Sequence, residues 1–293
     1  MTERDYLSKM IKRRKRRNFI RFYIIIVILL ISAMAFVIPD RGVAHDSEVY
    51  CDASECDDWT RYAIAMTNSD CEEILINYTG FTVSFNPVMH IPNWVAWTIT
   101  ASQLENPVVS RSQGTFTTDM NISGCASIYD YRNSGYDRGH MAPAADMKWN
   151  VQAMRDCFLL TNIAPQTTSL NTGAWNKLEQ ACRNIASVDS LGMAVVICGP
   201  VMTQGYMDKI GDSQVVVPPA FFKVVLYRRK DGALASIGFI MNNGTVEGGI
   251  QKCAMTVDEI EAVTGHDFFT TLPDSLQMII ESKYDFYNFS TGR

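Results

Sequence analysis

The sequence predicts an α+β fold built on a central antiparallel sheet, and three observations support this prediction. Several short runs are rich in β-branched and aromatic residues and are separated by Gly, Pro or charged turns. One segment carries a single apolar stripe with helical spacing. Another segment begins with the residues of a helix cap. With 293 residues and a hydrophobic content of 47%, the chain can bury a substantial core.

Five runs are the strand candidates. Residues 81–85 alternate apolar and polar side chains, as a half-buried strand does, and residues 92–100 follow as a second strand. The three later candidates are richer in β-branched and aromatic residues, and they are 191–198, 220–227 and 235–241. Their separation by turn residues favours antiparallel neighbours in one sheet.

Two segments are predicted to be helical. The apolar stripe of residues 173–186 follows the i, i+3, i+7, i+10 pattern of one helix face. It is formed by Trp175, Leu178, Cys182 and Ile185. Thr256 and Glu259 have the spacing of a capping box, which predicts that a further helix begins there.

The charge of the chain is unevenly distributed. Residues 1–21 contain nine Lys/Arg and two acidic residues, a net charge of +7, so the other 272 residues carry −12 of the total of −5. An acidic body argues against a protein that binds nucleic acid through many Lys/Arg–phosphate contacts. It does not argue against a site in which a divalent cation reverses the local field.

An uncharged apolar segment, residues 22–38, follows the basic tail. Its seventeen residues are at the short end of the range for a transmembrane helix, about 17–25 residues. The Lys/Arg excess before it predicts a cytoplasmic tail at 1–21 and export of the body to the periplasmic or extracellular side. A cleaved signal peptide is the alternative, with small residues at 33–35 or 42–44 as cut sites. The protein would then be secreted.

The remaining chain divides into a linker and one domain. Residues 39–75 are polar and acidic and are predicted to form a linker, and residues 76–293 form the predicted domain. All eight cysteines follow the apolar segment, which fits an oxidising compartment. Cys51 and Cys56 are close enough to close a small loop, although the pairing stays open. A zinc site is disfavoured because no CxxC or CxxH pair occurs.

The most informative motif is the run Tyr136-Asp-Arg-Gly-His-Met-Ala-Pro143. Two further pieces follow at 162–166 and 170–179. A histidine beside arginine and aspartate, with an asparagine at the start of a helix, supplies a base, a phosphate clamp and an oxygen ligand. Hydrolysis of a phosphodiester needs these parts, because water must lose a proton and the growing charge must meet a cation.

The spacing of Asn171 and Glu179 suggests how a cation would be held. Eight residues on one helix correspond to roughly 80° of rotation and about 12 Å of rise. Mg²⁺ takes oxygen ligands and keeps several waters, so one side-chain ligand is acceptable if other groups hold those waters. Glu179 would therefore hold a metal-bound water, with Asn171 on the metal.

With these pieces in order, the sequence resembles the DNA/RNA non-specific endonucleases of the ββα-metal superfamily, whose hallmark is Asp-Arg-Gly-His. The resemblance runs from about Pro92 to Pro273. It rests on residues 94–97, Arg111 with Phe116 and Asp119 after it, 137–140, 162–166, 171–179 and 256–269. It implies a ββα-metal catalytic element on one face of the central sheet. The one N-terminal transmembrane helix is predicted separately, from the apolar segment 22–38.

The resemblance also implies the activity and the role of each residue. Similar enzymes cut DNA and RNA with little sequence specificity, because they contact the backbone rather than the bases. They leave 5′-phosphate ends and use Mg²⁺, with Mn²⁺ as a substitute. His140 would be the general base and Asn171 the direct metal ligand. The implied supporting residues are Glu179 on a metal-bound water, Arg111 and Arg138 on the phosphate, Asn162 on the His140 loop, and Asp137. A homodimer is compatible with this reading.

Other interpretations compete with this one. His140 alone is more often a structural histidine, Arg138 a salt-bridge partner, Asn171 a helix N-cap and Glu179 a solvated helix residue. The tryptophans at 94, 97, 149 and 175 are better explained by core packing than by base stacking. At the level of function, the rivals are a phosphodiesterase with another substrate, a nuclease for one sugar type, an inert nuclease-like binding module, and an adhesion or scaffold module.

Overall fold

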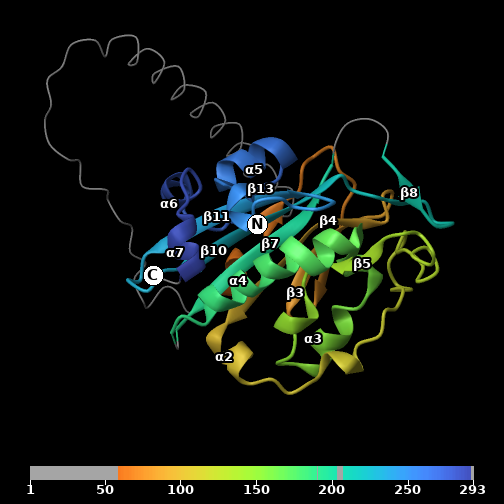
Figure 1. The fold of residues 1–293 in the computed structure, drawn as a ribbon, viewed down its shortest axis with the longest axis horizontal. Helices are drawn as coiled ribbons and strands as arrows, with labels where there is room; N and C mark the ends of the chain where they lie inside the picture. Colours follow the sequence, from red (N-terminus) through yellow and green to blue (C-terminus); the bar gives the residue numbers. More distant parts are fainter. Residues whose placement is uncertain (1–58, 190, 203–206, 292–293) are drawn as a thin grey trace, which may run out of the picture. The chain divides into compact units, whose positions relative to one another are not determined.

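The computed structural model describes residues 59–189, 191–202 and 207–291. A seven-stranded antiparallel sheet with the order β12-β11-β10-β7-β4-β3-β2 lies at its centre (Figure 1). The strands are β2 Ile74–Tyr78, β3 Phe81–Asn86, β4 Ile91–Thr100, β7 Met193–Val201, β10 Ala220–Arg228, β11 Leu234–Asn242 and β12 Ala254–Met255. The predicted mixed fold with a central antiparallel sheet is confirmed, and each predicted strand has its counterpart.

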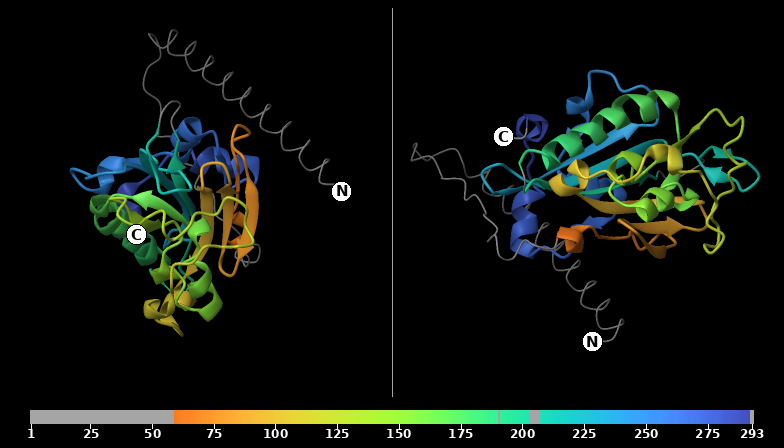
Figure 2. Two further views of the ribbon diagram at one scale, coloured as in Figure 1. Left: turned by 90° about the vertical axis from the view of Figure 1, so that its right-hand side faces the viewer. Right: turned by 90° about the horizontal axis from the view of Figure 1, so that it is seen from below.

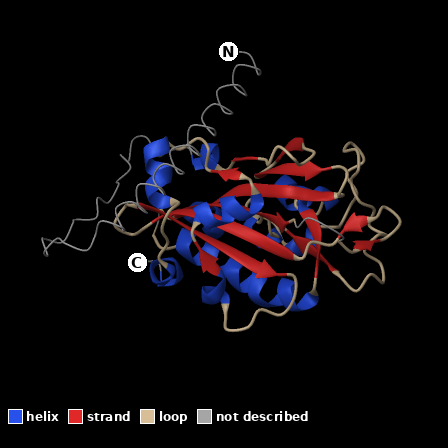
Figure 3. Ribbon diagram, turned by 90° about the horizontal axis from the view of Figure 1, so that it is seen from above, coloured by secondary structure: helices blue, strands red, loops and turns tan. Residues whose placement is uncertain are grey.

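Both faces of the sheet are buried, which explains the nearly continuous apolar runs of its central strands. Along β10, Phe221 and Val225 belong to the core on one face, whereas Phe222 and Val224 belong to the core on the other. This alternation is the two-residue period of a strand. Figures 2 and 3 show the sheet from other sides, with helices on both of its faces.

The first face carries helix α4, Asn176–Ala186, which contacts β4, β7 and β10 (Figure 1). The predicted apolar stripe is confirmed, since its four residues are at most 1% exposed: Trp175, Leu178, Cys182 and Ile185. Trp94 and Trp97 are buried in the sheet, and Trp149 packs against the core. Core packing therefore accounts for these tryptophans.

The second face is covered by α5, Val257–Thr264, α6, Asp274–Ile280, and the short strand β13, Asp267–Phe268. The capping box is confirmed, because the Thr256 side chain accepts from the Glu259 backbone N–H and the Glu259 side chain accepts from that of Thr256. The remaining short elements are α2 Ala101–Glu105, α3 Val151–Asp156, α7 Phe286–Thr291, and the hairpin of β8 Lys209–Ile210 and β9 Val215–Val216.

The fold begins earlier in the chain than the boundary expected at residue 76. A 3₁₀ turn, Trp59–Tyr62, packs on the second face of the sheet, and β1, Ala65–Met66, pairs with β13. Trp59 and Tyr62 are each 3% exposed, so their rings contribute apolar area that a linker would leave in water. Part of the segment expected as a linker is thus folded.

The basic tail, the apolar segment 22–38 and the pair Cys51 and Cys56 lie outside the described residues. In the part of the chain that the structure describes, no helix is both long and apolar enough to cross a bilayer. The transmembrane prediction for residues 22–38 therefore stays a prediction. The six cysteines of the described part are free thiols: Cys71, Cys125, Cys157, Cys182, Cys198 and Cys253.

The sequence motif forms a separate strand pair beside the main sheet. β5, Asp137–His140, runs antiparallel to β6, Ile163–Gln166, with His140 opposite Ile163. The chain then enters a π-helical turn, Leu170–Trp175, that continues into α4. The α-helix predicted from residue 173 begins at Asn176, and the π-helical turn before it is kinked at Gly173, with φ −99° and ψ −109°. Two strands followed by a helix are the arrangement expected from the resemblance.

Candidate active site

Gly139, in the middle of β5, packs directly on the partner strand. A Cβ atom built on it would lie 2.2 Å from Oε1 of Gln166, whose side chain is fully buried. Any side chain at position 139 would have to displace that amide. The glycine of the motif is thus required by the lack of space between β5 and β6.

Asp137, at the start of β5, contacts the π-helical turn. Asn171 donates a hydrogen bond from Nδ2 to Oδ2 of Asp137 at 3.0 Å. Thr168 donates from Oγ1 to the other carboxylate oxygen at 2.9 Å. Asn171 is therefore not a side-chain cap of α4. Since its nitrogen is engaged by Asp137, its amide oxygen remains available to a cation.

His140 lies in a triangle of aromatic rings. Its ring centroid is 5.2 Å from that of Phe116 and 4.8 Å from that of Phe158, and the two phenylalanine centroids are 5.0 Å apart. Its Nε2 atom is buried and has no hydrogen-bond partner among the described residues. Trp175 donates from Nε1 to the His140 carbonyl at 3.4 Å, so the turn that carries Asn171 packs against the end of β5.

The surroundings of His140 keep its imidazole neutral. Burial, and secondly the charge of Arg111, lower the pKa of His140 to about 3. A neutral imidazole has a free lone pair, which a general base requires. A phosphodiester bound at Arg111 would offset the positive charge and raise this pKa, so the ring would become a stronger base when substrate is present.

Arg111 and Arg138 each stack on one ring of the triangle. The Cζ atom of Arg138 lies 4.9 Å from the centroid of Phe116, and that of Arg111 lies 5.5 Å from the centroid of Phe158. Neither guanidinium forms an ion pair or side-chain hydrogen bond within the described ranges. The salt-bridge interpretation of Arg138 is thus not what the structure shows. Both sets of N–H groups are available to a phosphate.

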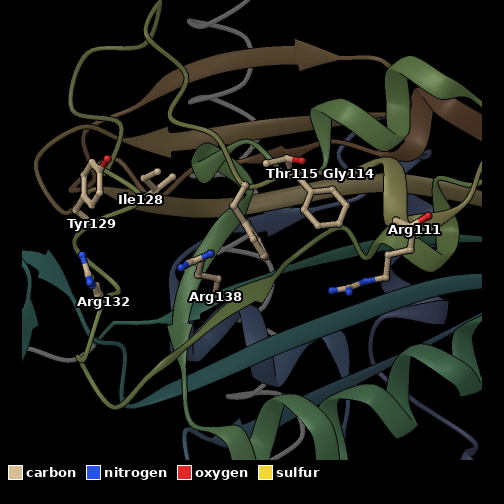
Figure 4. A pocket seen from close by; sticks show the side chains of 10 residues that line it. Arg111, Gly114, Thr115, Ile128, Tyr129, Arg132 and Arg138 are labelled. Atoms are coloured by element: carbon tan, nitrogen blue, oxygen red, sulfur yellow. The ribbon is translucent and has the colours of Figure 1, made fainter.

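The two arginines line one cavity of about 840 Å³, shown in Figure 4. Its wall includes both phenylalanines of the triangle, so it opens beside His140. A phosphate that enters this cavity would meet two cationic side chains held on aromatic rings.

Asn162 stabilises the loop after His140. Its Oδ1 accepts from the Ala142 backbone N–H at 2.9 Å, and its Nδ2 donates to the carbonyl oxygens of Ala142 at 2.9 Å and Cys157 at 2.8 Å. Its side chain is fully buried. These bonds join the segment after the motif to the segment that carries Phe158, as expected for a residue that holds the His140 loop.

Glu179 is partly buried on α4, and its environment is not that of a solvated helix residue. Burial raises the pKa of Glu179 to about 7, and the positive charge of Lys223 opposes this rise. One helical turn later, Arg183 forms an ion pair with Asp146 at 2.8 Å. Asp146 also accepts from Nε1 of Trp97 at 2.9 Å, so a buried polar network lies beneath the site.

Lys223, like Asp146 and Arg183, is a residue of this region that the sequence analysis did not identify. It is fully buried, and its Nζ atom has no hydrogen-bond partner among the described residues. It lies 4.2 Å from the ring centroid of Trp175 and 5.4 Å from that of Trp97. The signal was a single lysine within the apolar run 220–227, where the period of two directs it to the α4 face.

Comparisons with known proteins give consistent results. Residues 60–275 match the model of a family described as DNA/RNA non-specific endonuclease. The chain is similar to "Nuclease EXOG, mitochondrial" of Danio rerio, with 32% identity over 67% of this chain and 60% of that protein. It is also similar to a "Nuclease" of a Nostoc species, with 31% identity over 70% of this chain and 76% of that protein.

A solved structure is similar as well. A chain of the EndoG/EndoGI complex superposes with a TM-score of 0.64 and 28% identity, over 69% of this chain and 88% of that chain. Human "Endonuclease G, mitochondrial" is 35% identical over 48% of this chain and 50% of that protein. The chain thus spans about 60% of the length of the Danio rerio relative.

Proposed function

Because the chain belongs to the family of DNA/RNA non-specific endonucleases, we propose that it is a metal-dependent endonuclease that hydrolyses DNA and RNA with little sequence specificity. The observation that carries this proposal is the ring triangle, which holds a neutral histidine between two arginines without acidic partners. The proposed general base and phosphate clamp thus belong to one cluster of packed rings.

In this proposal His140 accepts a proton from the attacking water at a free ring nitrogen. The water oxygen forms a bond to phosphorus, and the bond from phosphorus to the 3′ oxygen breaks. Arg111 and Arg138 donate to the phosphoryl oxygens as negative charge grows on them. The leaving 3′ oxygen takes up a proton from solvent water, so the products are a 5′-phosphate and a 3′-hydroxyl end.

The residues present fit a hard divalent cation, which we propose to be Mg²⁺, with Mn²⁺ as a substitute. When bound, it would stabilise charge on the phosphate and the leaving oxygen. The amide oxygen left by the Asn171–Asp137 bond is a suitable ligand atom, and Glu179 offers a second-layer acceptor. The one group of three neighbouring carboxylates found in the described part, Asp258, Glu261 and Glu281, belongs to the α5–α6 region instead.

We also propose that the domain acts outside the cytoplasm, for nutrient scavenging or defence against foreign nucleic acid. The support is the order of basic tail and apolar segment at residues 1–38. Cell fractionation followed by protease treatment of intact cells and of spheroplasts, which lack the outer barrier, would test it. Protection of the domain from protease in spheroplasts, together with its absence from the medium and from the periplasmic fraction, would contradict it.

Digestion of plasmid and of RNA by the full-length protein tests the activity, each with Mg²⁺ and with chelator. We expect cleavage of both with Mg²⁺ and none with chelator. His140→Ala should reduce cleavage by about 10²–10⁴-fold. His90→Asn is the matched control, since Asn tolerates the positive φ of 61° at that position.

Each alternative function predicts a different outcome of these assays. Cleavage that survives His140→Ala would remove the proposed mechanism. Binding without cleavage by the wild type would indicate an inert nuclease-like module. Cleavage of small phosphodiesters alone would indicate a phosphodiesterase with another substrate.

A further inference from the structure

The cavity beside His140 extends past the two arginines assigned to the scissile phosphate. Arg132 and Tyr129 line the same cavity, and Figure 4 shows Arg138 between Arg132 and Arg111. Arg132 is exposed and has no ion pair or side-chain hydrogen bond within the described residues. Three guanidinium groups without acidic partners therefore share one cavity, on a body whose charge is strongly negative.

The loop that carries Tyr129 and Arg132 is anchored by the two buried residues between them. Between them, Asp130 and Tyr131 are 3% and 4% exposed. Asp130 accepts from the backbone N–H groups of Ser127 at 2.7 Å and Ser213 at 3.0 Å. The buried neighbours thus fix the loop, so Tyr129 and Arg132 are held ready for a ligand and little ordering is needed on binding.

The β8–β9 hairpin provides the second half of this anchor. Gly211, at its turn, has φ +65°, and a Cβ atom there would lie 2.3 Å from Cα of Asp130. Only glycine allows the hairpin to approach the loop this closely. The position of the loop is therefore built into the fold.

Tyr129 is unusual for an anchored loop, since its side chain is 71% exposed. An exposed aromatic ring next to an unpaired guanidinium matches the two parts of a nucleotide. The guanidinium suits a phosphate, and the ring suits the face of a base.

We propose that Arg132 and Tyr129 form a subsite for a nucleotide adjacent to the scissile bond, with the phosphate on Arg132 and the base stacked on Tyr129. This inference rests on the proposed nuclease activity and deepens it. A base can stack on the tyrosine only when it is unpaired. The subsite therefore favours single strands, loops and frayed ends over intact duplex.

The test compares a long substrate with one that cannot reach the subsite. The full-length protein is assayed on a single-stranded oligonucleotide, on the same sequence as a duplex, and on bis(p-nitrophenyl) phosphate, which has one phosphate and no base. The variants are Tyr129→Ala, Tyr129→Phe, Arg132→Ala and the control Lys230→Ala, an exposed residue that does not line the cavity.

Tyr129→Ala is expected to raise KM for the single strand by about 5- to 150-fold with little change in kcat, the range for loss of one stacked base. Tyr129→Phe should keep the wild-type value, and the preference for single strand over duplex should shrink in Tyr129→Ala alone. Arg132→Ala should reduce the slope of log(1/KM) against log salt by about 0.7, the value for one phosphate contact on a single strand.

None of these variants should change hydrolysis of the small diester. An equal loss on diester and oligonucleotide would overturn the subsite, because Arg132 or Tyr129 would then act at the scissile phosphate. Wild-type behaviour of Tyr129→Ala and Arg132→Ala on every substrate would overturn it while leaving the proposed function intact. A wild type that cleaves no substrate would overturn both.

Discussion

Asn171 donates its amide hydrogen bond to Asp137 across the gap between the π-helical turn and β5, at 3.0 Å. The bond determines which end of the Asn171 amide remains for a cation. Asp137 is itself fixed by the hydroxyl of Thr168 at 2.9 Å. The first residue of the motif thus acts on the proposed metal site through another side chain, as outer-layer carboxylates do elsewhere.

Asp137→Ala should therefore weaken metal binding more than it weakens folding. Without the carboxylate, the Asn171 amide can rotate and present its nitrogen. We expect the Mg²⁺ concentration for half-maximal cleavage to rise by about 10- to 100-fold, with partial recovery at high Mg²⁺. A Mg²⁺ titration of plasmid cleavage measures this, and Thr168→Val is the control with a smaller shift. An unchanged half-saturation point would contradict the role of the Asn171–Asp137 bond.

Asn162→Ala should destabilise the fold. Its side chain makes two hydrogen bonds to the backbone of Ala142, in the buried loop after His140, and a third to the backbone carbonyl of Cys157. Each unsatisfied buried group is expected to cost about 1–3 kcal/mol. A loss of at least about 2 kcal/mol would lower Tm by roughly 4–8 °C for a domain of this size. Calorimetry measures it, with Asn184→Ala on the exposed side of α4 as the control. Equal Tm values for the two variants would argue against the role assigned to Asn162.

Glu179→Gln should stabilise the protein at alkaline pH. The folded-state pKa of Glu179 is about 7, above its ordinary value of 4.5, so the folded state binds this proton more tightly than the unfolded state. The stabilisation that comes from protonated Glu179 is complete below about pH 4.5 and is lost as the pH rises through 7. At pH 8 the variant should be more stable than the wild type, by about 1–3 kcal/mol, and the difference should shrink towards pH 5.

Urea unfolding at both pH values measures this difference. The exposed Glu247→Gln should show no such dependence on pH. A Glu179→Gln variant that is less stable than the wild type at pH 8 would mean that the ionised carboxylate has a favourable partner. The nuclease activity of Glu179→Gln should fall although its stability at pH 8 rises, since the variant lacks the carboxylate.

Lys223→Met should shift the pH dependence of cleavage. The lysine charge opposes the rise in the pKa of Glu179, so its removal should raise that pKa further. We expect the acidic limb of the kcat profile to move to higher pH, with near-normal rates at about pH 9. Met fills a similar volume, and replacing a buried charge by an apolar side chain is often neutral for stability. The control is Lys230→Ala, and coincident acidic limbs in wild type and Lys223→Met would reject the coupling.

The fold could be predicted from sequence where one local pattern determines it. The strands at 81–85 and 220–227 and the cap at Thr256 follow from periods and spacings. β5 and β6 could not, because the motif is short and polar and its partner strand contains Pro165. The folded segment at Trp59 was missed because nothing local shows which surface its ring would cover.

The site was predictable in its residue types and not in its contacts. The motif at 137–140 and the two residues on the following helix were identified through the family resemblance. The ring triangle was not, since Phe158 lies 18 residues beyond His140 and reaches it only through the fold. Lys223 was not identified because the apolar run around it predicts only a strand. A strand pattern does not show which side chains from other elements pack against each residue.

The stacking of Arg111 and Arg138 on phenylalanines has a consequence for how substrate is captured. Their charge is not cancelled by carboxylates, yet it is embedded in a body of charge −12. Because salt screens charges beyond about 8 Å under physiological conditions, a polyanion feels these arginines only at close range. Long-range attraction would not speed the encounter, as it does for basic nucleases. The proposed nuclease would instead act on strands that random diffusion brings to the mouth of its cavity.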